Sequence, residues 1–267
     1  MTGSVIQLAM NFGYPGSYSR MPDDVVANKP VDSDSAAIPF GAAVRLTTGN
    51  KFTLGDASLT ADNFAGIAVR EVKQAITLNA DQGSYAALDP CDVLLRGNTV
   101  IKLARGSATA GGAVLFRIAD GSATKAKNSY VGPIAAGNIV VIGDTSYTCG
   151  DGTGGTTTAA NIAAAAVTAG GVGTYTNSVL TIEFEAASAG AAGSATALDV
   201  YASSGPAVNE VVRVAGVDAV TGAKVGDFEA GSAVAGKTIE LPGVKFTTGE
   251  ADGNGIIEIS ITKRNNN

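Results

Sequence analysis

A glycine-rich run is the one conventional motif of the chain. Gly150, Gly152 and Gly155 satisfy the GxGxxG spacing between an expected strand and an expected helix. In dinucleotide-binding proteins, these glycines let the backbone approach a pyrophosphate at a helix N-terminus, and an acidic residue about 20 positions later binds the ribose. Here residues 173–177 contain no acid, and the next one is Glu183. The run is therefore interpreted as a flexible turn, and no cofactor is expected.

Paired carboxylates are the second candidate for chemistry, because carboxylate oxygens are ligands that Ca²⁺ prefers. Three pairs lie close in the sequence: Asp23 with Asp24, Asp32 with Asp34, and Glu250 with Asp252. None of them follows the EF-hand loop, and solvated turns explain them equally well. No spacing identifies a carboxylate pair for glycoside hydrolysis either. Neither a metal site nor a catalytic residue is predicted from these acids.

Histidine and tryptophan are absent from the chain. Without histidine, a Ser-His-Asp or Cys-His arrangement and a histidine-based zinc site cannot form. Carboxylates or lysines could still catalyse, but the composition favours a non-enzymatic protein. Cys91 and Cys149 lie far apart with no CxxC pairing. They are interpreted as buried thiols, with a crosslink between subunits as the alternative, and cytoplasmic synthesis is the simpler interpretation.

The charge balance limits the partners of the protein. The net charge is −6, from 24 acids and 18 bases, and no long basic run is present. Nucleic-acid binding is therefore not expected, because it needs clustered Lys and Arg. The charged fraction of 16% is low, which suits a protein packed against copies and neighbours. No apolar segment reaches the roughly 20 residues of a membrane span, and the first ten residues lack the pattern of a secretory signal.

Short runs of two-residue alternation, broken by glycine, predict a mainly β fold. Expected strands cover residues 40–46, 64–73, 111–118, 211–214, 224–228, 239–246 and 256–261. Residues 93–103 are interpreted as a hairpin that turns at Gly97 and Asn98, a favoured pair for a two-residue turn. Several strands at this spacing predict a barrel- or sandwich-like base domain, formed by residues 38–119 and 207–267.

The central part of the chain has a different sequence pattern. Residues 138–148 predict a hairpin that turns at Gly143 and Asp144, and residues 179–185 predict a strand. Between them, residues 156–167 predict an alanine-rich helix with a threonine cap. We therefore expect residues 120–206 to form a small inserted α+β module with a ββαβ-like order.

The N-terminal segment, residues 1–37, does not have the pattern of a packed element. Among its Gly and Pro residues it carries Phe12, Tyr14, Tyr18, Arg20 and Met21. One interpretation is an extended arm whose aromatic side chains anchor on a partner. The other is a loop that folds back onto its own domain. The sequence leaves both open.

Four arginines recur beside the expected strands: Arg70, Arg96, Arg105 and Arg117. They could pair with acids of a partner protein. Exposed strand faces usually carry such charges, so this pattern alone does not predict an interface.

The order of these pieces resembles the structural cement proteins that decorate the heads of tailed bacteriophages. The resemblance is carried by an arm that ends near Met21 and by residues 64–72, 92–97, 111–114, 224–228 and 241–246. The central module departs from this pattern and resembles small β-rich modules of other phage surface proteins.

The resemblance implies a virion structural protein that binds the outer surface of the capsid. Its implied partner is the major capsid protein, whose subunits it would bridge, and a symmetric dimer or trimer on the lattice would fit. The aromatic arm would be the main anchor. The alternative is a carbohydrate- or cell-surface-binding module of a phage tail or fibre, for which an aromatic fraction of only 6% is unfavourable.

Overall fold

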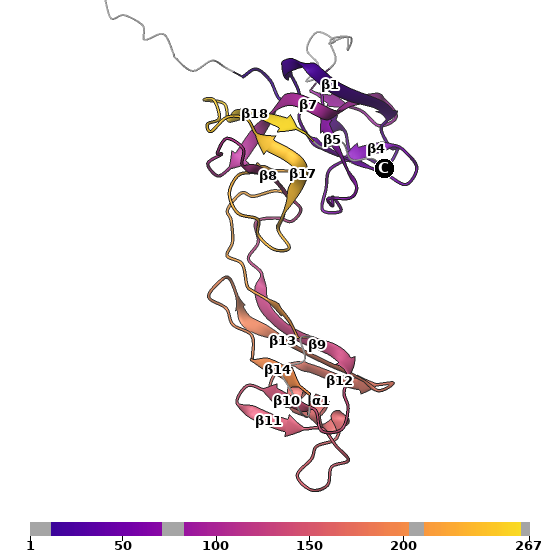
Figure 1. Ribbon diagram of the computed structural model, residues 1–267, viewed down its shortest axis with the longest axis vertical. Coiled ribbons are helices and arrows are strands. Elements are labelled where there is room, and N and C mark those ends of the chain that lie inside the picture. Colours follow the sequence, from indigo (N-terminus) through magenta and orange to yellow (C-terminus); the bar gives the residue numbers. More distant parts are fainter. Residues whose placement is uncertain (1–11, 71–82, 203–210, 263–267) are drawn as a thin grey trace, which may run out of the picture. The chain divides into compact units, whose positions relative to one another are not determined.

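The computed structural model describes residues 12–70, 83–202 and 211–262, without the side chains of residues 20–22. The chain divides into two compact units, which Figure 1 shows. The base unit combines residues 1–120 with 223–267, and the inserted unit is residues 121–222. The mainly β fold expected from the sequence, with a barrel-like base, is confirmed.

The base unit is built around one large sheet. The strands of the base unit are β1 (Tyr18–Pro30), β2 (Ile38–Pro39), β3 (Ala43–Leu46), β4 (Phe52–Leu54), β5 (Phe64–Ala68), β6 (Ser84–Tyr85), β7 (Pro90–Arg105), β8 (Ala113–Arg117), β16 (Phe228–Glu229), β17 (Thr238–Phe246) and β18 (Ile256–Ile261). Of these, β2 and β6 form a separate two-stranded sheet. The sheet order is β16-β8-β17-β18-β7-β5-β3-β4, and β16 also pairs with β7. This second pairing closes a five-stranded barrel from β7, β18, β17, β8 and β16. Closure removes the free edges that these strands would otherwise expose.

Strand β7 is the central strand of the base unit. It pairs with β1, β5, β18 and β16, so segments from both ends of the chain meet on it. The expected hairpin at Gly97 and Asn98 is therefore wrong, because β7 runs straight through these residues. Gly97 serves another purpose. A Cβ at this position would collide with the carboxylate of Asp24, which accepts a hydrogen bond from the Asn98 N–H.

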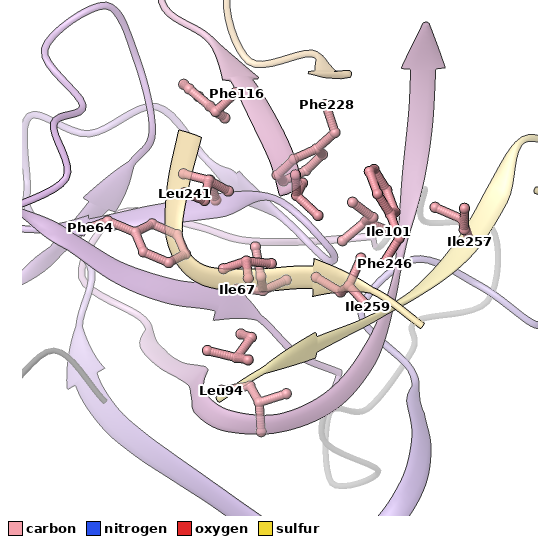
Figure 2. Packing of buried hydrophobic residues seen from close by; sticks show 14 of the residues in the cluster. Phe64, Ile67, Leu94, Ile101, Phe116, Phe228, Leu241, Phe246, Ile257 and Ile259 are labelled. Carbon is pink, nitrogen blue, oxygen red and sulfur yellow. The ribbon is translucent and has the colours of Figure 1, made fainter. Parts of the chain in front are cut away.

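The barrel interior is filled by aliphatic and aromatic side chains. Figure 2 shows side chains from β5, β7, β8, β16, β17 and β18 that point toward one another. Phe116 and Phe228 pack edge to face, with ring centroids 5.9 Å apart. A second cluster, which includes Phe52, Tyr85 and Cys91, is formed by residues from β3, β4, β6 and the first half of β7, among others. The alternation of apolar residues in the sequence thus corresponds to a real core.

Three of the recurring arginines pair within the base unit, among them Arg96, which pairs with Asp23 of β1. Arg117 Nε and Nη2 donate to Glu229 Oε1 and Oε2 at 2.6 and 3.0 Å, and both side chains are buried. Arg105 lies 3.6 Å from Asp227 and 3.5 Å from Glu229. Since these arginines already have acids of their own chain, their charges stabilise the base unit.

The inserted unit holds two sheets and one helix. Its elements are β9 (Lys125–Pro133), β10 (Ile139–Ile142), β11 (Thr145–Thr148), α1 (Ala159–Thr168), β12 (Val172–Thr176), β13 (Val179–Ala189), β14 (Leu198–Tyr201) and β15 (Val212–Val214). The sheets have the orders β11-β10-β14 and β12-β13-β9-β15. Thr158 caps α1, and the helix packs Ile162, Ala163 and Ala166 into the core of the unit.

The inserted unit is richer in strands than the sequence indicated. The hairpin, the helix and the strand at residue 179 are present, and β9, β12 and β14 are additional. The strand at residues 212–214, which the sequence placed in the base, pairs with β9 instead. Strand β9 was missed because its core-facing positions include only Ala126 and Tyr130 as large or apolar buried residues, so it has little hydrophobic alternation.

Candidate capsid-contact surface

The N-terminal turn, residues 12–17, is tied to the barrel through its backbone. Gly16 N–H donates to Val100 O at 2.8 Å, and Arg70 N–H donates to Gly16 O at 2.9 Å. Gly16 and Gly41 have φ angles of +80° and +78°, and they approach each other closely. A Cβ on Gly16 would lie 2.7 Å from Gly41 N and 2.9 Å from Ala68 O. Only glycine fits this contact, so the turn is seated in a fixed position.

A carboxylate of the β17–β18 loop holds the start of this turn. Phe12 N–H donates to Asp252 Oδ2 at 3.2 Å. The other oxygen, Oδ1, accepts from the N–H groups of Ile256 and Asn254. These bonds favour the ionised form and lower the pKa of Asp252, the Ile256 N–H most of all and those of Asn254 and Phe12 after it, while burial opposes the shift. Asp252, which the sequence offered as a calcium ligand, is therefore a backbone anchor.

Tyr14 is the exposed aromatic residue of the turn. Its side chain is 74% exposed, although Ser17 N–H donates to its carbonyl oxygen at 3.0 Å. A large side chain thus projects into solvent from a backbone that hydrogen bonds fix. This arrangement suits an anchor residue, because little order must be gained when a partner binds.

The other predicted contact residues lie in or against the sheet. Tyr18 starts β1 and packs against the barrel cluster. Arg20 pairs with Asn98 through the backbone of β1, while its side chain and that of Met21 lie outside the described part. Residues 18–30 are therefore a strand of the base unit and not an extended arm. The prolines are compatible with it because Pro22 falls in a bulge and Pro30 ends the strand.

The described ranges of the structure contain no cluster of side chains that could hold a metal ion. Among residues 12–70, 83–202 and 211–262, no three His, Cys, Asp or Glu side chains lie close enough to hold a metal ion. The Asp32 carboxylate accepts a hydrogen bond from Asp34 N–H, as in an ordinary turn. No helix in the described ranges is long and apolar enough to span a membrane.

Side chains of the glycine-rich run form hydrogen bonds with one another within the run. Asp151 Oδ1 accepts from the N–H and the hydroxyl of Thr153, at 2.9 and 2.7 Å, and from the Thr156 hydroxyl. These bonds, those of Thr153 first, lower the pKa of Asp151. A cavity of about 300 Å³ lies beside it, lined by residues that include Cys149, Thr158 and Tyr175. An ionised carboxylate in the loop is unfavourable for a pyrophosphate, which agrees with a turn rather than a nucleotide site.

Both cysteines are free and buried. Burial, and after it the negative charge of Asp92, raises the pKa of Cys91 to about 12. Burial also raises the pKa of Cys149. Both thiols therefore remain protonated at neutral pH and are unsuited to linking subunits in the folded state.

The residues that seat the turn were missed as a group by the sequence analysis. Gly16 and Gly41 are two of 35 glycines, and nothing in the sequence brings them together. The signal that was available is the Gly-Tyr-Pro-Gly composition of residues 13–16, which is typical of a turn.

Similarity to known proteins identifies the family of the chain. A chain of "The capsid of Myoviridae Phage XM1" matches with 16% sequence identity and a TM-score of 0.33, over 67% of this chain and 93% of that one. No curated protein matches. The family profile described as structural cement protein (E217 gp24/Pam3 gp6) matches residues 2–262, nearly the whole chain. The chain therefore belongs to the family of structural cement proteins.

Proposed function

We propose that this protein binds the outer surface of the assembled phage capsid and bridges adjacent subunits of the major capsid protein. Membership in the cement family supports a structural role in the virion. The bridging role and the placement on the outer surface are our extension of it.

The observation that carries the proposal is the seated N-terminal turn. Tyr14 is 74% exposed, and the turn below it is fixed by the contact between Gly16 and Gly41 and by Asp252. Tyrosine is enriched among the residues that dominate interface energies, and a rigid support lowers the entropy lost on binding. The base unit therefore presents an aromatic anchor for a pocket on a capsid subunit.

Repetition on the lattice amplifies this contact. If copies associate as a dimer or trimer at a lattice axis, each further contact forms at high effective concentration. Modest single interfaces then stabilise the whole shell.

Co-sedimentation with capsid shells tests the proposal. The purified protein is mixed with bare expanded shells or with unassembled capsid protein, and binding and shell melting temperature are measured. We expect saturable binding to shells alone and a higher melting temperature. Tyr14→Ala should weaken binding by about 30-fold, as for an interface residue that contributes about 2 kcal/mol. Val225→Ala is the matched control, because Val225 is an exposed apolar residue of the base unit outside the turn.

Failure to bind any form of the shell would overturn the proposal. In that case, a glycan-binding screen would test the alternative of a carbohydrate- or cell-surface-binding module. Shell binding that Tyr14→Ala and Val225→Ala reduce equally would retain the cement role and reject the turn as the anchor.

A further inference from the structure

The outward face of the β12-β13-β9-β15 sheet is more apolar than the solvent-facing side of a sheet usually is. The opposite face holds Leu180, Ile182 and Phe184, which pack in the core with α1. Antiparallel sheets that are packed on one side usually present polar residues on the other. Here the outward positions include five valines, all exposed: Val131, Val172, Val179, Val212 and Val214.

The strand register places these valines on a defined grid. One row across the sheet reads Val172, Glu183, Ser129 and Val212, from β12 to β15. A neighbouring row reads Thr174, Thr181 and Val131, and the next reads Thr176, Val179 and Pro133. On the other side of the first row lie Glu185, Lys127 and Val214. Valine and the methyl groups of threonine thus border a small group of charged residues on three sides.

The charged residues of this face carry no net charge, and the two signs lie on different strands. Its lysines, Lys125 and Lys127, are on β9, and its acids, Glu183 and Glu185, are on β13. Within the sheet Lys127 pairs with Glu183 at 2.6 Å, and Lys125 lies 3.8 Å from Glu185. Because the two signs occupy adjacent strands, the face carries no net repulsion against a copy of itself.

We propose that this sheet face binds the same face of a second copy of the chain. The occupant follows from symmetry. A two-fold axis parallel to the strands, between β13 and β9, sets β9 against β13 of the other copy and β12 against its β15. Lys127 then faces Glu185 of the other copy, and Val172 faces Val212. A two-fold across the strands at Ser129 would instead set Lys127 against Val131 of the other copy, which gives the charges no partners across the interface.

The size of the face indicates a weak association. Four strands about 4.8 Å apart and rows about 6.8 Å apart give roughly 400 Å² per copy. The total of about 800 Å² is below the 1,200–2,000 Å² of stable interfaces. The contact therefore forms at high local concentration, as among copies held side by side on a surface. The inference itself does not depend on capsid binding and is testable with the free protein.

Site-directed crosslinking of the full chain tests the register. Val172→Cys and Val212→Cys are combined in one chain, and a bis-maleimide spanning about 10 Å, the usual distance between packed sheets, is added over a range of protein concentrations. We expect a covalent dimer whose yield rises with concentration, linked between residues 172 and 212. The matched control combines Val167→Cys with Val212→Cys, because Val167 is equally exposed but lies on α1, on the other side of the sheet. This control should give only background crosslinking, as should the unsubstituted chain.

Charge reversal separates a designed contact from random collision. In the crosslinking variant, Lys127→Glu should lower the dimer yield by about tenfold, since the repelling pair occurs twice around a two-fold axis. Adding Glu185→Lys should restore the yield. Equal crosslinking in the 172/212 and 167/212 variants would overturn the proposal. So would a higher yield from Val172→Cys alone, because residue 172 would then face itself.

Discussion

Phe228→Ala should open the base unit and leave the inserted unit intact. Phe228 lies on β16, the two-residue strand that closes the barrel between β7 and β8. It is buried and packs edge to face on Phe116. Replacing a buried Phe by Ala costs about 3–5 kcal/mol, and the short strand should relax enough for the lower value. A loss of about 3 kcal/mol raises the population of the open state roughly 150-fold.

The two buried thiols provide the assay, since each reports on one unit. Cys91 packs in the second cluster of the base unit, and Cys149 packs in the core of the inserted unit. With its pKa raised to about 12, Cys91 has roughly one part in ten thousand of thiolate at pH 8, so alkylation requires opening. Alkylation of each cysteine is followed by mass spectrometry of its peptide. Phe228→Ala should accelerate labelling of Cys91 by about 150-fold and leave Cys149 unchanged.

Phe184→Ala is the matched control. Phe184 is equally buried, in the same core as Cys149, so this variant should accelerate Cys149 and not Cys91. The reasoning is refuted if Phe228→Ala accelerates Cys91 less than tenfold, because β16 would then not hold the barrel closed. Equal acceleration of both cysteines would show that the two units unfold together.

Three further predictions concern the base unit. Arg117→Met should lower the free energy of unfolding in urea by about 3 kcal/mol, because the buried Glu229 carboxylate loses its bidentate partner and keeps Arg105 at 3.5 Å. A decrease of less than about 1 kcal/mol would contradict this prediction. Gly16→Ala should lower the free energy of unfolding by about 1–3 kcal/mol, because Gly16 has a positive φ and approaches Gly41 closely. Hydrogen exchange of the Arg70 amide should then become faster. The control Gly49→Ala should leave that exchange unchanged, because no backbone atom lies near the Cβ of residue 49. The pKa of Asp252 is lowered in the folded protein, so its contribution to stability is present above about pH 3.8 and is lost as the pH falls through the lower folded pKa. Exchange of the Phe12 amide should therefore increase in acid, and Asp252→Asn should remove that pH dependence; an unchanged pH profile in the variant would refute the role of this carboxylate.

The secondary structure of the chain followed from local patterns where those patterns were strong. The alternation in residues 179–185 and 256–261 and the alanine-rich run after Thr158 each led to a real element. Local reasoning failed at Gly97, where a favoured turn pair lies inside a continuous strand. No turn forms at this position because the pairings of β7 with β1 and β18 continue through it. Hydrogen bonds to distant segments outweigh the local turn preference.

The candidate contact residues were found by type but not by role. Aromatic residues among turn formers drew attention to the N-terminal segment, and the structure separates the exposed Tyr14 from Tyr18, which packs on the barrel. This difference depends on the partner strand, since β7 supplies the pairing that turns residues 18–30 into a strand. The sequence contains no signal for that pairing.

By itself, the sequence determined the class of the protein: mainly β, without histidine chemistry, and similar to cement proteins over its two ends. Composition and periodicity are local properties, so they can be obtained without contacts. Tertiary structure alone decided which strands close the barrel, which glycines seat the turn, and which valines share one sheet face. These features join residues up to 240 positions apart, as Phe12 and Asp252 are, and only packing and hydrogen bonding between distant segments can specify them.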